Sequence, residues 1–165
     1  MKQVKYQKIL VTHDGSDLAS TALPHAAALA LAFNADVLML QVVNSVEQQI
    51  AMMSTSSIGI YPIPVGSGVL ETVREYKRFA KHQLEEFKTD FEKSGIKNIK
   101  ILVKEGSDRD EILETAEKEN CDLIVMSTHG RTGLKRALLG SVADHIVRHS
   151  ECPVFLVNPS RTSKK

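Results

Sequence analysis

Cysteine is scarce in this sequence of 165 residues, which contains Cys121 and Cys152 and no other cysteine. Two cysteines are too few for the disulfide framework of a small secreted domain, and neither has the spacing of a metal-binding pair. Because both lie in apolar sequence contexts, we expect them to be buried small hydrophobic residues.

An excess of charge of one sign is also missing, since 21 lysine and arginine residues stand against 20 aspartate and glutamate residues. This balance excludes the basic field of a general nucleic-acid-binding protein. No apolar run reaches the roughly 18 residues that cross a bilayer, and the N-terminus lacks the apolar core of a secretion signal. We therefore expect a single cytoplasmic domain over residues 1–165, without nucleic-acid or membrane partners.

Short apolar runs alternate with helical patterns along the chain. Strands are predicted at 8–12, 35–43, 99–103, 122–126 and 153–157, and helices at 17–34, 73–91, 110–119 and 141–149. Strands that alternate with helices form a parallel sheet with helices on both faces. The sequence thus predicts an α/β fold with one doubly wound, five-stranded parallel sheet, in strand order 2-1-3-4-5 or 3-2-1-4-5.

Residues 44–68 follow neither pattern, because they combine a serine- and threonine-rich run at 54–57 with Pro62 and Pro64. A long irregular segment in a compact domain is often functional. We interpret it as an insertion loop that covers a ligand or contacts a partner protein. Residues 158–165 form a polar C-terminal tail.

A ligand is expected beyond the carboxyl ends of the first and fourth strands, because the strand order reverses beside the first strand in both topologies. The stretch 127–143, after the fourth strand, contains three glycines, three cationic residues and no acidic residue. A helix beginning at Ser141 directs free N–H groups and the positive end of its dipole toward an anion. The stretch is neither a P-loop nor G-x-G-x-x-G. From these residues alone, a phosphate cradle and a plain turn both remain open.

The arrangement resembles the universal stress protein family over essentially the whole chain. The resemblance rests on residues 9–16, 122–126, 128–131, 139–144 and 152–157. Nucleotide-binding members carry the motif G-x2-G-x9-G-[ST] after the fourth strand. Gly130, Gly140 and Ser141 match this motif, whereas Ser127 stands at its first glycine and Thr12 replaces a common proline.

The resemblance implies a Rossmann-like fold, of the adenine nucleotide alpha hydrolase type, that binds ATP. Asp14 would lie at the ribose–adenine end, and Val42 would offer backbone hydrogen bonds to the adenine. An accompanying Mg²⁺ or Mn²⁺ ion would bridge phosphate oxygens instead of occupying a protein cage. The residues expected to bind the nucleotide are Thr12, Asp14, Val42, Met126, Ser127, Gly130, Arg131, Gly140, Ser141 and Val142.

Some of these residues have simpler explanations. Asp14 could cap the following helix, alone or while also contacting a ligand. His129 has no identifiable nucleophile or orienting carboxylate beside it, which favours a histidine that shapes the loop or lies near phosphate over a general base. Arg131, Lys135 and Arg136 could form a solvated basic face.

The resemblance further implies a homodimer in which the last strand pairs its edge with a second copy, although the polar tail alone could shield that edge. No Walker lysine, arginine finger or catalytic carboxylate can be assigned, so ATP hydrolysis is expected to be slow at most. The leading hypothesis is a nucleotide-responsive stress regulator with an unknown protein partner. The alternative, which Thr12 and Ser127 favour, is a stress-response interaction module that binds no nucleotide.

Overall fold

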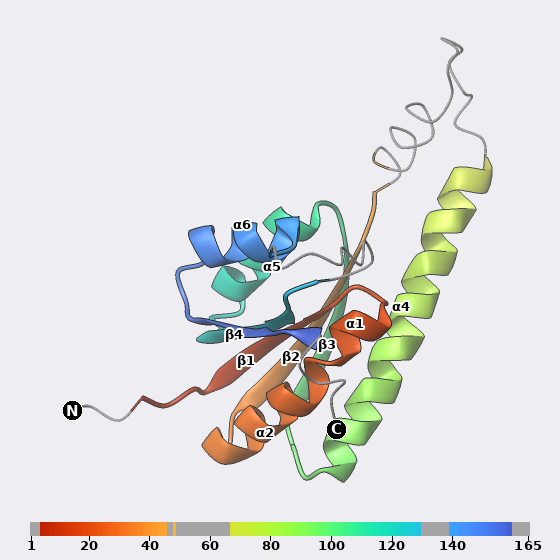
Figure 1. The fold of residues 1–165 in the computed structure, drawn as a ribbon. Helices are drawn as coiled ribbons and strands as arrows, with labels where there is room; N and C mark the ends of the chain where they lie inside the picture. The colour runs from red at the N-terminus through yellow and green to blue at the C-terminus, as the bar shows by residue number, and fades with distance from the viewer. Residues whose placement is uncertain (1–3, 46–47, 49–66, 130–138, 160–165) are drawn as a thin grey trace.

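A five-stranded, fully parallel sheet forms the centre of the molecule (Figure 1). The computed structural model describes residues 4–45, 48, 67–129 and 139–159. The strands are β1 (Lys8–His13), β2 (Asp36–Val43), β3 (Ile99–Glu105), β4 (Leu123–Ser127) and β5 (Val154–Val157). Their order is β3-β2-β1-β4-β5. The predicted fold is confirmed, and the second of the two predicted strand orders is the one adopted.

Helices cover both faces of the sheet (Figure 1). The described helices are α1 (Asp17–Ser20), α2 (Leu23–Phe33), α4 (Ser67–Lys93), α5 (Asp108–Lys118) and α6 (Ser141–His149). The alternation of side chains along each strand creates one apolar cluster per face. Ile9 and Val11 pack in the cluster that includes α2 and α4, whereas Leu10 packs in the cluster that includes α5 and α6. Both faces of the sheet are therefore buried from solvent, which explains the nearly continuous apolar runs of the strands.

The helix predicted over 17–34 is two helices, and this part of the prediction is wrong. The chain bends at Thr21 and Ala22, and Pro24 lies in the first turn of α2. Proline has no N–H to donate to the preceding turn, so a continuous helix would lose a hydrogen bond at this point.

Helix α4 begins at Ser67, so the last two residues of the expected insertion 44–68 belong to this helix. Of the remaining insertion, all but residues 44, 45 and 48 lies outside the described residues. The helix ends at Lys93, and Gly95 follows with φ +102°. This backbone conformation favours glycine, so Gly95 suits the end of the helix.

Charged side chains join the strands at their amino ends. The Asp122 carboxylate accepts hydrogen bonds from the backbone N–H groups of Gln7 (2.8 Å) and Lys8 (3.2 Å). Lys100 Nζ lies 2.6 Å from a Glu119 carboxylate oxygen, and this hydrogen bond lowers the pKa of Glu119. These contacts tie β1, β3 and the turn before β4 together at the end of the sheet from which the strands start.

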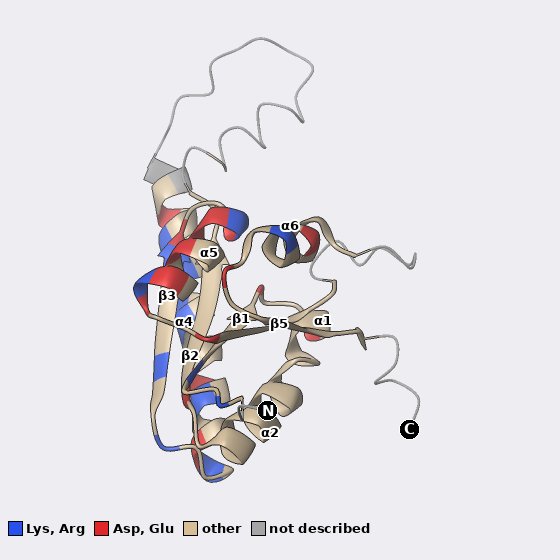
Figure 2. Ribbon diagram, turned by 90° about the vertical axis from the view of Figure 1, so that its left-hand side faces the viewer, with Lys and Arg blue, Asp and Glu red and all other residues tan. Residues whose placement is uncertain are grey.

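The outer layer is a mixture of acidic and basic residues over α4 and α5, whereas α2 carries no charged residue (Figure 2). Cys121 is buried, as expected, and burial raises the pKa of its thiol to about 11. Cys152 is only partly buried, so the expectation of full burial is wrong for this residue. Among the described helices, none has the length and apolar character needed to cross a membrane.

Candidate functional site

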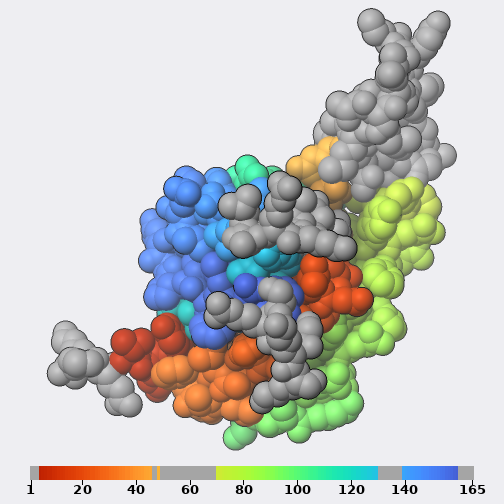
Figure 3. Space-filling view, in the orientation of Figure 1, coloured from red at the N-terminus to blue at the C-terminus, as the bar shows by residue number. Residues whose placement is uncertain are grey.

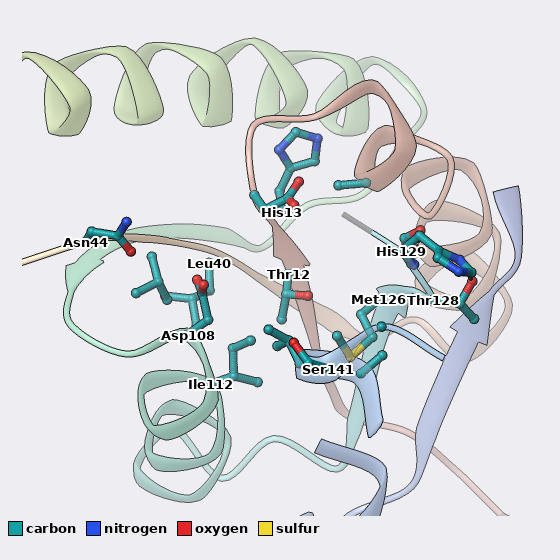
Figure 4. Close-up of a pocket in the computed structure, with 17 residues that line it drawn as sticks. Thr12, His13, Leu40, Asn44, Asp108, Ile112, Met126, Thr128, His129 and Ser141 are labelled. Carbon is teal, nitrogen blue, oxygen red and sulfur yellow. Dashed lines mark hydrogen bonds between the residues drawn. The ribbon is translucent and has the colours of Figure 1, made fainter. Parts of the chain in front are cut away.

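A pocket of about 480 Å³ opens at the carboxyl ends of β1, β2 and β4 (Figure 4). Its volume lies within the range of small-molecule sites. The pocket lies where the strand order reverses. From β1 the chain adds β2 and β3 on one side of the sheet, and then β4 and β5 on the other side of β1. This is the position at which ligands bind in doubly wound sheets.

Eight of the ten expected nucleotide-binding residues line this one pocket, although they come from separate parts of the chain. They are Thr12, Asp14, Val42, Met126, Ser127, Gly140, Ser141 and Val142. The other two, Gly130 and Arg131, lie outside the described residues, as do Lys135 and Arg136.

Asp14 shapes the turn between β1 and α1. Its Oδ1 accepts hydrogen bonds from the backbone N–H of Ser16 (3.0 Å) and from the Ser16 hydroxyl (2.6 Å). Ser16, not Asp14, is the N-cap of α1, because its Oγ accepts a hydrogen bond from Ala19 N–H at 3.1 Å. Asp14 therefore lines the pocket and also stabilises the cap indirectly, through its hydrogen bonds to Ser16.

Gly140 joins the end of β4 to the start of α6. Its N–H donates to the Thr128 carbonyl at 2.9 Å, and a Cβ at this position would lie 2.8 Å from the same oxygen. Its φ of −62° is ordinary, so glycine is required here by close approach of two backbone segments and not by a positive φ.

The N-terminus of α6 has no side-chain cap, because its N-cap residue is Gly140. The first helical hydrogen bond runs from Asp144 N–H to the Gly140 carbonyl at 2.8 Å. The N–H groups of residues 141–143 precede that bond, and all three residues line the pocket. Such N–H groups, together with the helix dipole, favour an anionic ligand.

Ser127 fits the position where the family motif has glycine. It is the last residue of β4, is buried, and is not among the residues with positive φ. Its Oγ accepts a hydrogen bond from His129 N–H at 3.3 Å. The side chain is thus accommodated inside the turn that follows β4.

His129 and Thr128 lie together at one end of the pocket (Figure 4). The Nδ1 atom of His129 lies 2.9 Å from Thr128 Oγ1, whereas its buried Nε2 atom has no hydrogen-bond partner in the described part of the chain. Among the described residues, Thr128 is the only side chain that hydrogen-bonds to the ring, so the geometry agrees with a histidine that shapes the turn.

The opposite end of the pocket contains residues that the sequence analysis missed. Asn44 and Asp108 lie at this end, with Leu40 and Ile112 beside them (Figure 4). Asn44 directly follows β2, and Asp108 is the first residue of α5 after β3. Their positions could have indicated a place in the pocket, because polar residues shortly after a strand lie at the carboxyl edge of the sheet.

The pocket is therefore chemically asymmetric. One end presents the Asp108 carboxylate and the Asn44 amide, and the other presents the uncapped helix α6. Apolar side chains of Leu40, Val42 and Ile112 line part of the space, and they suit a flat hydrophobic group. In the part of the chain that the structure describes, no group of three or more His, Cys, Asp or Glu side chains could hold a metal ion.

Known proteins resemble this chain along nearly its whole length. The model of the universal stress protein family matches residues 5–158. Universal stress protein MJ0531 of Methanocaldococcus jannaschii is 37% identical over 153 residues, which cover 92% of this chain and 82% of that protein. Universal stress protein MJ0577 of the same organism is 34% identical over 158 residues, which cover 93% of this chain and 96% of that protein.

Solved structures agree with this similarity. The structure of MJ0577 matches with a TM-score of 0.76 and 31% sequence identity, and the match covers 94% of this chain and 97% of that one. A universal stress protein family protein from Arabidopsis thaliana, solved with AMP bound, has the same fold with a TM-score of 0.57 and 20% identity. That match covers 92% of this chain and 91% of the Arabidopsis chain.

Proposed function

Because this chain belongs to the universal stress protein family, we propose that its pocket binds an adenine nucleotide, with ATP as the first candidate. The observation that carries the proposal is the uncapped N-terminus of α6, whose first residues line a pocket at the switch point of the sheet. The Arabidopsis structure supports it, since it contains AMP in a protein of the same fold.

The asymmetry of the pocket gives the nucleotide its orientation in this proposal. The phosphates lie against the N–H groups of residues 141–143, where the helix dipole stabilises negative charge. The Asp108 carboxylate would repel a phosphate, but it can accept hydrogen bonds from ribose hydroxyls or from the adenine amino group. The base therefore lies toward Asp108, between the apolar side chains of Val42 and Ile112.

A divalent ion is a secondary part of the proposal. Mg²⁺ keeps several waters and is commonly bound through substrate phosphates, so it does not need a cage of protein ligands. We propose that Mg²⁺ or Mn²⁺ bridges phosphate oxygens of the bound nucleotide. Among the described residues, Asp14 and Asp108 are the carboxylates that line this pocket. In our proposal Asp108 lies beside the adenine, so it is not a ligand of the ion.

The direct test is binding by the purified wild-type protein. Mass spectrometry under native conditions should detect a bound adenine nucleotide after gentle purification, and calorimetry with Mg-ATP should give saturable heat and a raised Tm. Hydrolysis should be slow at most in a multiple-turnover assay. No bound nucleotide, no heat and no Tm shift at millimolar Mg-ATP would contradict the proposal and favour the interaction module that binds no nucleotide.

We also propose that two copies associate through the edge of β5 and that nucleotide occupancy regulates a protein partner. In the described part of the chain, β5 pairs only with β4, and Phe155 on this strand is 39% exposed. The Phe155 ring lies 6.0 Å from the ring of His25 on α2, a helix without charged residues. The edge therefore continues into an uncharged surface, as in interface cores. Figure 3 shows the blue C-terminal segment beside the orange segment of α2.

Phe155→Asp is expected to convert a dimer into a monomer, because it places a charge in the centre of this uncharged surface. Light scattering over a dilution series should give about twice the 18.2 kDa chain mass for the wild type and one chain mass for the variant. Phe79→Asp is the matched control, since Phe79 is an exposed aromatic residue on α4. A wild type that is monomeric at tens of micromolar, or a Phe155→Asp variant that stays dimeric, would rule out this interface.

A further inference from the structure

His13 is the last residue of β1 and borders the pocket. Successive residues of a strand face opposite sides, so Thr12 faces the centre of the pocket and the ring of His13 extends toward α4 (Figure 4). The residue is 4% exposed, and its ring packs against Phe87 of α4 with a centroid distance of 4.8 Å. No role was expected for this residue from the sequence.

The hydrogen bonds of the His13 ring define its protonation state. Gly15 N–H donates to Nδ1 at 3.0 Å, so Nδ1 must be unprotonated. The proton of the neutral ring is therefore on Nε2, which lies 2.9 Å from Ser20 Oγ and donates to it. The Ser20 hydroxyl is then directed to the Ser16 carbonyl at 3.4 Å.

The ring thus connects the turn that carries Asp14 to helix α1, which follows it. Gly15 has φ +86°, and its N–H is held by His13, while Ser16 is held by the Asp14 carboxylate. Ser20, at the other end of this network, lies in α1. The position of the Asp14 backbone therefore depends on a ring that packs against α4.

We propose that His13 is a positioning residue: its neutral ring holds the turn 14–16 in the conformation that binds the nucleotide, and protonation of the ring releases this turn and weakens binding. The inference rests on the proposed function, which it extends to regulation by pH. A protonated ring carries a hydrogen on Nδ1, and this hydrogen would meet the Gly15 N–H, so the bond between them cannot form in the charged state.

The groups around the ring define the expected direction. Burial has the larger effect and lowers the pKa of His13, whereas the charge of Asp14, the charged group that acts on the ring among the described residues, favours protonation. The neighbouring elements present Ser20 from α1, and Gln41 and Gln83 from β2 and α4, none of which is ionisable. The affinity for the nucleotide should therefore be highest above the pKa of His13 and should fall as the pH falls through this pKa.

The surroundings also offer acceptors for the released state. Gln41 lies opposite His13 in the register of β1 and β2, and Gln83 of α4 lies near Gly15. The side-chain oxygens of both glutamines are buried and have no hydrogen-bond partner among the residues that the structure describes. A ring that has turned away from Gly15 could donate its second hydrogen to one of them, which gives the protonated state a defined alternative arrangement.

The first experiment examines the protein without nucleotide, so its outcome does not depend on the proposed function. Nitrogen-15 NMR of the histidine side chains at pH 7.5 should show His13 as the neutral ring with its hydrogen on Nε2. Titration to lower pH should show protonation of His13 together with loss of exchange protection at Gly15 N–H. A hydrogen on Nδ1 at pH 7.5, or a Gly15 amide that stays protected after protonation, would overturn the inference.

The second experiment measures Mg-ATP affinity against pH in the wild type, His13→Asn and His13→Phe. Asparagine can accept the Gly15 hydrogen bond and cannot be protonated, so it reports the pH dependence of the nucleotide itself. Between pH 7.5 and the pH at which the NMR titration shows His13 to be protonated, the wild type should lose about tenfold more affinity than His13→Asn, as for loss of one buried hydrogen bond. His13→Phe should bind about tenfold more weakly than His13→Asn at pH 7.5.

Identical pH profiles for the wild type and His13→Asn would overturn the regulation by pH, and equal affinities of the asparagine and phenylalanine variants would overturn the positioning role. Folding of each variant is checked by its Tm. If no variant and no wild-type protein binds Mg-ATP at any pH, the proposed function fails, while the NMR titration still decides whether His13 controls the turn.

Discussion

Gly140→Ala is expected to weaken nucleotide binding by roughly 10- to 100-fold, the scale of losing a hydrogen bond to a charged phosphate group. The added Cβ would lie 2.8 Å from the Thr128 carbonyl oxygen, a backbone atom that cannot rotate away. One of the two segments must shift, and the hydrogen bond from Gly140 N–H to that oxygen is displaced with it. The start of α6, and with it the proposed phosphate site, moves out of place.

The fold should survive this substitution, because φ of −62° at Gly140 suits alanine and residues 139 and 140 lie outside regular structure. Gly95→Ala is the matched control: φ of +102° makes alanine cost about 1 to 2 kcal/mol in stability, at the end of α4 and outside the pocket. Calorimetry with Mg-ATP and thermal unfolding should give lost binding for the first variant and lost stability for the second. Wild-type affinity in a folded Gly140→Ala protein would show that the phosphates bind elsewhere.

Ser141→Asp should weaken nucleotide binding while it slightly raises the stability of the protein. Ser141 is the exposed first residue of α6, and a carboxylate there interacts favourably with the helix dipole, by about 0.3 to 1 kcal/mol. The same carboxylate would stand next to the proposed phosphates. Two charges about 4 to 5 Å apart near a protein surface repel by roughly 3 to 4 kcal/mol, which corresponds to a loss of affinity of at least 100-fold.

Ser141→Asn is the control for this experiment, because asparagine has nearly the same shape as aspartate and no charge. We expect Ser141→Asn to stay within about threefold of the wild type, since the phosphates contact backbone N–H groups in this proposal. The difference between the two variants should shrink as salt is added, because exposed charges are screened. Equal Mg-ATP affinities of the two variants at low salt would place the phosphates away from α6.

The alternation of strands and helices was predictable from the sequence because both faces of the sheet are covered. Strands such as β4, with five buried residues of which four are apolar, leave a continuous run that needs no partner to be recognised. The strand order was not predictable, since helical crossovers of similar length serve either topology. The break between α1 and α2 had an indication in Pro24, which lies where the helix could not continue.

The same limit applies to the pocket. Residues after β1 and β4 could be proposed from the sequence, because β1 borders the switch point in both strand orders. Asp108 follows β3, which lies two strands from β1, and it reaches the pocket only because α5 packs over this side of the sheet. The accommodation of Ser127 was not predictable either, since its Cβ is tolerated because β4 holds the residue in an extended backbone.

The tie between Asp122 and the start of β1 has a consequence for how this protein can change in evolution. The hydrogen bonds from Asp122 lie at the amino edge of the sheet, and the proposed ligand contacts lie at the carboxyl edge. Substitutions such as those seen at Thr12 and Ser127 can therefore accumulate around the pocket with little penalty to folding. Chains with the same hydrophobic core can diverge in ligand preference, and each member's pocket has to be assayed on its own.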